Sequence, residues 1–367
     1  MDYKEKRICF IANNGNGAVP IDGERGKTRT YLNIFEKEHF DYDFIELAGW
    51  KKHPISLALK IKKSIKQCDV ILLMAATKGT RILIPYINQI NKRLKKRFVY
   101  SFIGLGPIYD FIKKMNEEEC ADFMNYNFGN ITDKRFAKEL KKVDLLLAEC
   151  ESLKNVINNF YGTDNCVVIN NFRDIELLPI KKKTYKYPLR LVYFSRVIPI
   201  KGIFDLVDSV IMANKITQKF VLDIYGPNQL DNEQNSRFKH SLEEHSFISF
   251  KGLLNYNEVF ETLSGYDLFC FPSKLKTEGV PGAISDAFLS GLPVLSSNYP
   301  KASDILKPNF DCICYEFLNK EDLVSKLNKI AENPSVLSKL SENVLETRNT
   351  FTYNFWRDKF LERLFGK

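Results

Sequence analysis

The chain has 367 residues, of which 44% are hydrophobic and 27% charged, and its formal net charge is +9. This length and composition are typical of a globular protein and favour two domains over one. No apolar run approaches the roughly 18–20 residues of a membrane-spanning helix. The charged N-terminus, MDYKEKRICF, does not read as a secretory signal peptide, so we expect a cytoplasmic protein.

The eight cysteines are spread over the whole chain, mostly inside apolar runs, and no two of them form a C-x-x-C pair. This pattern predicts buried, reduced thiols rather than disulfides or a zinc site. Cys312 and Cys314 have the spacing of one strand face and suggest a metal pair. Without a second pair or a nearby histidine, we expect them to lie in the core.

The first half of the chain alternates short apolar or β-branched runs with longer amphipathic stretches. Segments with helical spacing, such as KTRTYLNIFEKE (27–38) and SLKNVINNFYG (152–162), separate the runs. This β/α alternation predicts a parallel, doubly wound sheet. The runs typical of strands are RICFIAN (7–13), DFIELA (43–48), DVILLMAA (69–76), RFVYSFIG (97–104), DLLLAE (144–149) and NCVVINN (165–171).

A polar stretch, KKKTYKYPLR (181–190), has no apolar period and is typical of a linker. A second α/β series follows, with helical segments at 203–214, 256–265 and 282–291. We therefore predict two Rossmann-like domains, over 1–180 and 191–348. The strand candidates of the second domain are LRLVYFSR (189–196), KFVLDIYG (219–226), ISFKG (248–252), DLFCFPS (267–273), LPVLSS (292–297) and DCICYEF (311–317).

The last stretch, 349–367, carries a broad apolar stripe after the second sheet has run out of strands. The stripe consists of Phe351, Phe355, Phe360, Leu361 and Leu364. It predicts a terminal helix that docks on another part of the protein.

Positive charge is concentrated between Lys51 and Tyr100, where thirteen Lys or Arg residues face a single acid, Asp69. The charges are densest in KKHPISLALKIKKSIK (51–66) and NKRLKKR (91–97), and neither segment interleaves aromatic residues with them, which argues against a nucleic-acid partner. The segment KKHPISLALKIKKSIK (51–66) mixes apolar residues with lysines, which suits a helix lying on an anionic membrane. A solvated face of a helix packed on the core is the alternative, and the sequence leaves both open.

The segment EGVPGAISDAF places two carboxylates, Glu278 and Asp286, on either side of an expected helix start near Pro281. Proline suits the first helical position, and glycines at 279 and 282 allow a ligand to approach the backbone. A helix N-terminus attracts anions, above all phosphate. The order of carboxylate, anion site and carboxylate matches the sugar, diphosphate and ribose of a nucleotide sugar.

Two cations, Arg196 and Lys201, lie in the loop after the first strand of the second domain. At the carboxyl end of a strand they are placed to clamp a diphosphate. They would also stabilise the charge that develops on a leaving nucleoside diphosphate.

With these residues the chain resembles glycosyltransferase family 4, whose enzymes are retaining and have the GT-B fold. The motifs LVYFSRVIPIKGIFDLV, FVLDIYGPN and LFCFPSKLKTEGVPGAISDAFLSGLPVLSS carry the resemblance, strongest from Leu191 to Ser297. The N-terminal half resembles the family less specifically, through NNGNGAVPIDGERGKTRTYLN and LLLAECESLKNVINNF. Enzymes that build capsule, O-antigen lipopolysaccharide and other surface polysaccharides are the most similar.

The resemblance implies two domains that face a cleft, with the C-terminal helix (349–367) crossing back to the N-terminal domain. It implies a hexosyltransferase that moves a sugar from a UDP- or GDP-type donor to a saccharide acceptor, without a metal or other cofactor. The lipid-linked acceptor and the basic segment (51–97) would bring the enzyme to the inner face of the plasma membrane. The implied catalytic residues are Glu278, Arg196 and Lys201, and the implied donor-binding residues are Gly23, Tyr225, Gly226, Gly279, Val280, Pro281, Gly282 and Asp286.

The chain departs from the family pattern at two places. The family's second glutamate is replaced by Asp286, which is one methylene shorter and reaches less far toward a ribose. A histidine that many relatives carry in the first domain is missing, and Gly104 and Gly106 stand in that region. Asp41 and Asp43 form a D-x-D like the metal site of other glycosyltransferases, but we expect them to open a strand.

Two other functions fit the same fold. A nucleotide-sugar epimerase or a phosphorylase is one, although the acid–base side chains or pyridoxal phosphate that these need are not indicated. An accessory subunit without turnover is the other, and the Asp286 departure keeps it open.

Overall fold

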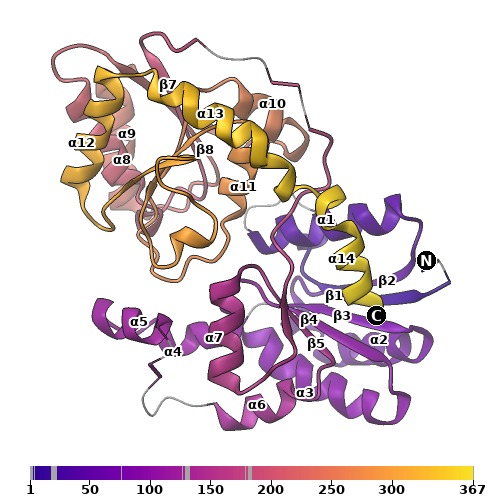
Figure 1. Cartoon of the computed structure of the whole chain (residues 1–367). Helices are drawn as coiled ribbons and strands as arrows, with labels where there is room; N and C mark the ends of the chain where they lie inside the picture. Colours follow the sequence, from indigo (N-terminus) through magenta and orange to yellow (C-terminus); the bar gives the residue numbers. More distant parts are fainter. Residues whose placement is uncertain are drawn as a thin grey trace. The chain divides into compact units, whose positions relative to one another are not determined.

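The computed structural model describes residues 3, 5–17, 23–75, 77–125, 127–128, 133–177, 179–180 and 184–366. Parts of the expected glycine-rich loop (18–22) and of the expected linker (181–183) lie outside the described residues. The chain divides into two compact units (Figure 1). Unit 1 is Met1–Asp174 with Tyr353–Lys367, and unit 2 is Ile175–Thr352.

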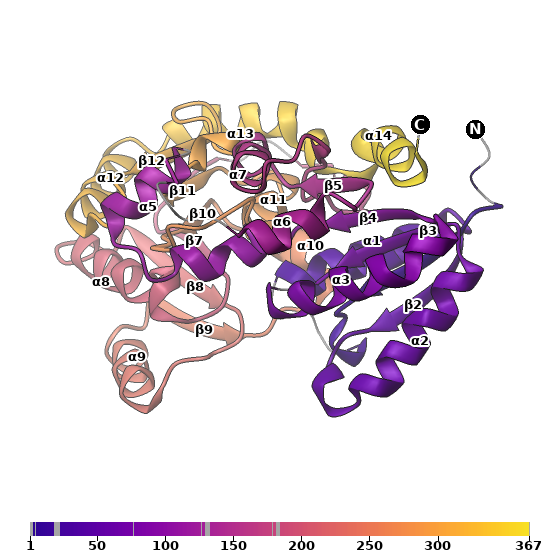
Figure 2. The same cartoon turned by 90° about the horizontal axis from the view of Figure 1, so that it is seen from below.

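Unit 1 is built on a parallel six-stranded sheet with the order β2-β1-β3-β4-β5-β6. The chain passes from β1 to β2 in one direction and from β3 to β4 in the other, which creates a topological switch point between the carboxyl ends of β1 and β3. Helices α2 and α3 pack side by side (Figure 2). The strands are β1 Arg7–Ala12, β2 Asp41–Glu46, β3 Val70–Met74, β4 Arg97–Ser101, β5 Leu145–Ala148 and β6 Cys166–Val168. The helices are α1 Gly23–Lys37, α2 Pro54–Gln67, α3 Thr77–Leu94, α4 Tyr109–Ile112, α5 Glu117–Met124, α6 Lys134–Leu140 and α7 Glu151–Tyr161.

The C-terminal helix α14 (Tyr353–Phe365) belongs to unit 1 and lies near α1 (Figure 1). Phe360 is fully buried in the core of unit 1, and its ring centroid is 5.0 Å from that of Tyr31. Glu38 at the end of α1 accepts hydrogen bonds from Arg357 at 2.7 and 2.8 Å. The expected packing of this helix on the N-terminal domain is confirmed, although Phe355 of the predicted stripe is exposed.

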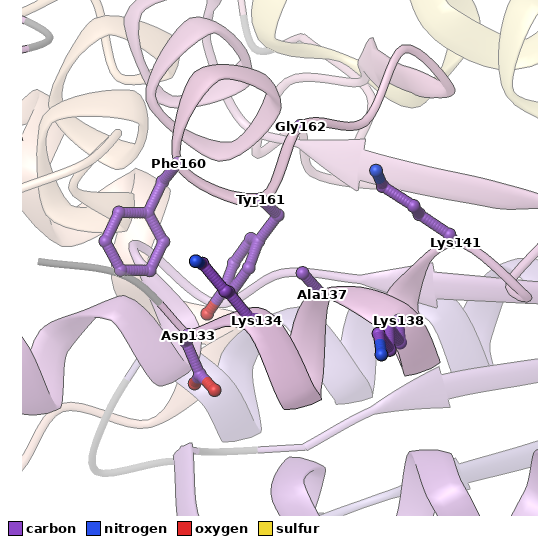
Figure 3. A pocket seen from close by; sticks show the side chains of 8 residues that line it. All are labelled: Asp133, Lys134, Ala137, Lys138, Lys141, Phe160, Tyr161 and Gly162. Carbon is purple, nitrogen blue, oxygen red and sulfur yellow. The ribbon is translucent and has the colours of Figure 1, made fainter.

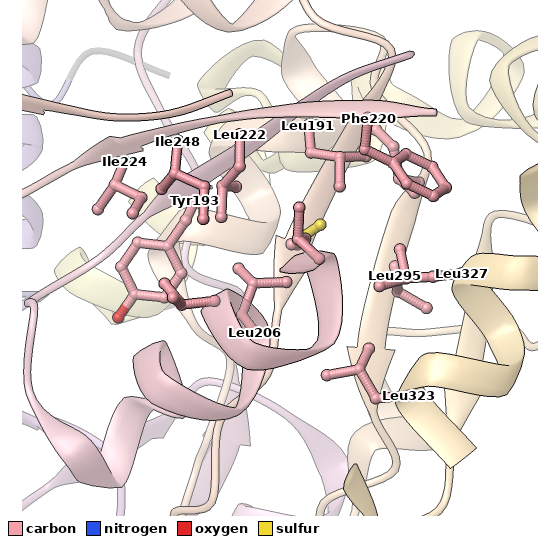
Figure 4. Close-up of a cluster of buried hydrophobic side chains, with 14 of the residues drawn as sticks. Leu191, Tyr193, Leu206, Phe220, Leu222, Ile224, Ile248, Leu295, Leu323 and Leu327 are labelled. Atoms are coloured by element: carbon pink, nitrogen blue, oxygen red, sulfur yellow. The ribbon is translucent and has the colours of Figure 1, made fainter. Parts of the chain in front are cut away.

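Unit 2 contains the second parallel sheet, with the order β12-β11-β10-β7-β8-β9. Its switch point lies between β7 and β10. A core of aliphatic and aromatic side chains from the sheet, α8 and α12 fills one face (Figure 4). The strands are β7 Leu189–Phe194, β8 Phe220–Tyr225, β9 Ile248–Gly252, β10 Leu268–Phe271, β11 Val294–Ser297 and β12 Cys312–Tyr315. The helices are α8 Ile203–Ala213, α9 Asn232–Glu244, α10 Val259–Ser264, α11 Gly282–Leu289, α12 Lys320–Glu332 and α13 Val336–Thr347.

The predicted fold class is confirmed, since each of the twelve expected strand segments overlaps one strand of the two sheets, although β2 begins two residues before its expected segment. All eight cysteines are free, and only Cys314 among them is not fully buried. Among the described helices, none combines the length and the apolar composition that crossing a membrane requires.

Candidate functional site

The candidate site of unit 2 lies at the carboxyl end of its sheet, where the loops after β7 and β10 meet. The backbone N–H of Lys274 donates to the carbonyl of Ile200 at 2.9 Å and ties the two loops together. Gly202 has a φ of 75°, and a Cβ there would lie 1.8 Å from the Pro272 carbonyl oxygen. Glycine is therefore required for the two loops to approach at the switch point, the usual ligand site of such sheets.

Glu278 and Lys201 form an ion pair in which each residue is only 8% exposed. Ser273, which follows β10, donates its hydroxyl to the same carboxylate oxygen, Oε1, at 2.5 Å. The Lys201 ammonium also lies 5.4 Å from the centre of the Phe271 ring. A buried charge pair of this kind is costly to desolvate and requires both partners. The two residues predicted as catalytic from separate motifs, 77 positions apart, are thus in direct contact.

Helix α11 begins at Gly282, and Pro281 is its N-cap, with a ψ of 120°. The expected place of Pro281 at the first helical position is wrong by one residue, because the proline ring fixes φ and leaves ψ to the loop. The carbonyl of Pro281 accepts from the N–H groups of Ile284 and Ser285 at 3.0 and 3.3 Å. Among the described residues, the N–H groups of Gly282 and Ala283 have no hydrogen-bond partner. Since both residues are half-buried, these donors are available to an anion.

Asp286 lies one turn into α11 and is 8% exposed. Its backbone carbonyl accepts from the N–H of Ser290 at 3.1 Å and from the Ser290 hydroxyl at 2.8 Å. These bonds fix the backbone of Asp286 on a short helix whose end is capped by Ser290. Its direct reach to a ribose stays a prediction.

Arg196, the second predicted cation, does not join the Lys201 pair. Its guanidinium forms no hydrogen bond or ion pair with any residue that the structure describes, and the side chain is half-buried. The Arg196 carbonyl accepts from the hydroxyl of Tyr193 at 2.6 Å. Burial raises the pKa of Tyr193, so this hydroxyl stays protonated and its hydrogen bond to the Arg196 carbonyl stabilises the loop after β7.

Tyr225 is the last residue of β8 and Gly226 follows it, beside the loop that carries Arg196. Gly226 has a φ of 135°, and a Cβ there would lie 1.8 Å from the Ser195 carbonyl oxygen. The Tyr225 hydroxyl lies 3.0 Å from that of Tyr266, which donates to Asp223 at 2.7 Å. Gly226 thus has a packing reason to be glycine, and the Tyr225 hydroxyl is fixed by its neighbours.

Gly23 begins α1 in unit 1, at the carboxyl end of that sheet. A Cβ at this position would meet no described atom within 4 Å. One turn further along, Lys27 is buried and pairs with Glu149 at 3.1 Å, and it donates to the carbonyl of Phe102 at 3.2 Å. Sequence reasoning missed this pair, although Lys27 stands four positions before the core residue Tyr31 on the buried face of the helix.

The D-x-D residues lie at the opposite end of the unit 1 sheet. Arg7 pairs with Asp43 at 2.8 Å and with Asp41 at 3.6 Å. In the part of the chain that the structure describes, no group of three or more His, Cys, Asp or Glu side chains is arranged to hold a metal.

A pocket of about 330 Å³ lies in unit 1 between α6 and the end of α7 (Figure 3). It contains none of the predicted site residues. Its lining residues are Asp133, Lys134, Ala137, Lys138, Lys141, Phe160, Tyr161 and Gly162.

Comparison with known proteins identifies the sequence of unit 2. Residues 174–347 match the family model described as "Glycosyl transferases group 1". A search of curated proteins finds no match.

Solved structures match almost the whole chain at low sequence identity. The chain is similar to Anabaena HepE in complex with UDP-glucose, at 15% identity and a TM-score of 0.69, and to a sucrose-phosphate synthase from Thermosynechococcus elongatus, at 14% and 0.72. It is also similar to the lipopolysaccharide outer core galactosyltransferase WaaB, at 17% and 0.66. Each comparison covers 98% of this chain and 99% of the other.

Proposed function

Since the chain is a nucleotide-sugar-dependent glycosyltransferase of family 4, with residues 174–347 in the group 1 family, we propose that unit 2 binds the donor at the carboxyl end of its sheet. The family and the enzyme class expected from the sequence are confirmed. The proposed reaction transfers a sugar with retention from a UDP- or GDP-type donor to a saccharide acceptor. The proposed acceptor is a lipid-linked saccharide that is extended during the synthesis of a cell-surface polysaccharide.

The observation that carries the donor site is the meeting of Glu278, Lys201 and the free N–H groups of α11 at one switch point. The carboxylate of Glu278 accepts hydrogen bonds from hydroxyl groups of the donor sugar, and its ion pair with Lys201 holds it in place. The diphosphate lies between Arg196 and the N–H groups near Gly282, flanked by the backbone of 279–281. Asp286 takes the ribose hydroxyls, while Tyr225 and Gly226 border the base.

Bond breaking occurs between the anomeric carbon of the sugar and the leaving diphosphate oxygen. The acceptor hydroxyl forms the new bond on the same face, and its proton passes to the leaving phosphate. Arg196, Lys201 and the α11 N–H groups stabilise the charge that grows on that phosphate. We assign no side chain as general base, and the proposed site uses these cations rather than a metal.

UDP is the first nucleotide to test, because Anabaena HepE, a protein of similar fold, was solved in complex with UDP-glucose. We expect Arg196→Gln to raise the Kd of UDP at least about tenfold, equal to about 1.4 kcal/mol, in isothermal titration calorimetry. The matched control is Arg237→Gln, an exposed arginine of α9 that pairs with Asp208. If Arg196→Gln binds both UDP and GDP as tightly as the wild type and the Arg237→Gln control do, the diphosphate does not lie beside Arg196.

Gly23 offers a second test, on the other unit. Its backbone is not in the left-handed region and a Cβ meets open space, so Gly23→Ala is expected to fold normally. A fall in transfer rate with an unchanged melting temperature would support close approach of a substrate. A fully active Gly23→Ala enzyme would remove this residue from the proposed site.

The outer face of α2 supports the membrane part of the proposal. Ile55 and Leu59 are 76% and 63% exposed, whereas Leu57 and Ile61 are buried against the unit 1 core. Residues 51–66 carry lysines and no acidic residue. Exposed apolar side chains within a cationic surface favour contact with anionic lipids.

Vesicle binding tests this surface. The double variant Ile55→Ser/Leu59→Ser should lower binding to vesicles that contain anionic lipid. The matched control is Ile216→Ser, because Ile216 of unit 2 is 97% exposed. If the double variant binds such vesicles as well as the wild type, α2 presents only a solvated face.

A further inference from the structure

The loop after β1 (Asn13–Gly17) has a polar anchor that the proposed reaction does not yet include. This loop stands at the switch point of the unit 1 sheet, because β1 lies between β2 and β3. Ligands of doubly wound sheets bind beside such loops. The residue opposite the end of β1 is Glu46, the last residue of β2, which is paired with Ala12.

The Glu46 carboxylate accepts three backbone hydrogen bonds. The N–H of Asn14 donates to Oε1 at 3.0 Å, and the N–H of Asn16 donates to Oε2 at 2.9 Å. The N–H of Ala48 donates to Oε1 at 2.8 Å. Hydrogen bonds to an ionised acceptor are roughly twice as strong as neutral ones. Both carboxylate oxygens are therefore engaged in fixing this loop against the neighbouring strand.

The backbone of the loop explains why an anion is needed there. Gly15 and Asn16 are both left-handed, with φ of 67° and 54°. Such turns direct backbone N–H groups into one concave side, which favours an anion. The N–H of Gly15 is satisfied by the side chain of Asn13 at 3.0 Å, so Glu46 serves the N–H groups on either side of it.

We propose that Glu46 is a positioning residue for sugar transfer, because it fixes the loop after β1 in the conformation that borders the substrate region of unit 1. Glu46 acts through the loop and touches no reacting atom. The inference rests on the proposed function, since the loop conformation affects turnover only if substrate approaches this end of the unit 1 sheet.

The variants Glu46→Gln and Glu46→Ala test the inference. Glutamine keeps the shape of the side chain but replaces one oxygen with an NH₂ group, which cannot accept from Asn14 or Asn16. The matched control is Asp41→Asn, at the opposite end of the same strand, where Asp41 is exposed and lies 3.6 Å from Arg7. The measurements are steady-state transfer, UDP affinity and hydrogen exchange of the loop amides.

We expect both Glu46 variants to lower kcat/KM for transfer by about 10–100-fold, because a small misplacement of a loop is enough for such a loss. The amides of residues 14 and 16 should exchange faster, while the UDP affinity of unit 2 stays unchanged. The Asp41→Asn enzyme should match the wild type in all three measurements. A merely structural role would lower the melting temperature without this separation of turnover from donor affinity.

Two results overturn the inference alone. One is faster loop exchange with wild-type turnover, and the other is unchanged loop exchange in both variants. A wild-type enzyme that neither binds nucleotides nor transfers sugar would refute the proposed function as well, and that result does not depend on any Glu46 variant. Should Glu46→Ala fail to fold, Glu46→Gln still decides.

Discussion

The buried pair of Glu278 and Lys201 leads to the sharpest prediction, because its contributions to stability and to activity can be separated. Replacing only Glu278 leaves the Lys201 ammonium buried without its counterion, and replacing only Lys201 does the same to the carboxylate. Breaking a buried pair in this way costs about 3–5 kcal/mol. For a domain of this size, about 1 kcal/mol shifts the melting temperature by about 2–4 °C. Each single variant should thus melt about 6–20 °C lower.

The double variant Glu278→Gln/Lys201→Met removes both charges and should recover much of that loss. The two single losses sum to about 6–10 kcal/mol, so a double variant that is no less stable than either single variant has a coupling energy of at least about 3–5 kcal/mol. Melting temperatures of the wild type, the two single variants and the double variant complete the cycle. The residue exposures of 8% make solvent screening too weak to hide the effect. All three variants should lose transfer activity, whatever their stability.

The reasoning would be refuted if the loss of stability in the double variant equalled the sum of the losses in the two single variants. Additivity within about 0.3–0.5 kcal/mol is the behaviour of independent sites. It would mean that the carboxylate and the ammonium are not in contact in solution. If the cycle shows coupling but the double variant is active, Glu278 and Lys201 form an ion pair in the wild type but take no part in the reaction.

Three further predictions concern packing and pH. Gly202→Ala should destabilise unit 2 by about 3 kcal/mol or more, seen in urea unfolding, because it adds a Cβ to a left-handed residue in a closed contact. Lys27→Met should cost about 3–5 kcal/mol in the same assay by leaving Glu149 buried without its cation, and normal stability would exclude the pair. The hydrogen bond from Arg357 lowers the pKa of Glu38, so its stabilisation is present above the unfolded pKa of about 4.3 and is lost as pH falls through the lower folded value. Wild type should exceed Glu38→Gln by about 1 kcal/mol at pH 7 and lose that advantage in acid; an equal difference at pH 3 would contradict the assignment.

The strands and the order of the elements could be predicted because the information is local. Runs such as VILLM of β3 are apolar along their whole length, as strands buried on both faces of a sheet require. The apolar stripe before the C-terminus likewise predicted a docking helix, and Tyr353 and Phe360 are buried in unit 1.

The contacts that fix the loops could not be predicted, because they join residues far apart in sequence. Lys27 and Glu149 are 122 positions apart, and Glu46 reaches back 32 positions to Asn14. The sequence around Glu149 and around Glu46 has no local pattern from which the partner of either carboxylate could be predicted. The start of α11 shows a smaller limit, since the φ of Pro281 fits both a first helical residue and an N-cap, and only ψ distinguishes them.

The central claim is that unit 2 holds a nucleotide sugar for transfer with retention. The most direct measurement supplies a panel of UDP- and GDP-sugars with saccharide acceptors and follows nucleoside diphosphate release and the anomeric configuration of the product. We predict acceptor-stimulated release by the wild type with retained configuration, and a loss of about 100-fold or more in the folded Glu278→Gln/Lys201→Met enzyme. Inverted product, donor conversion without release as in an epimerase, or equal rates in the wild type and the double variant would contradict the account.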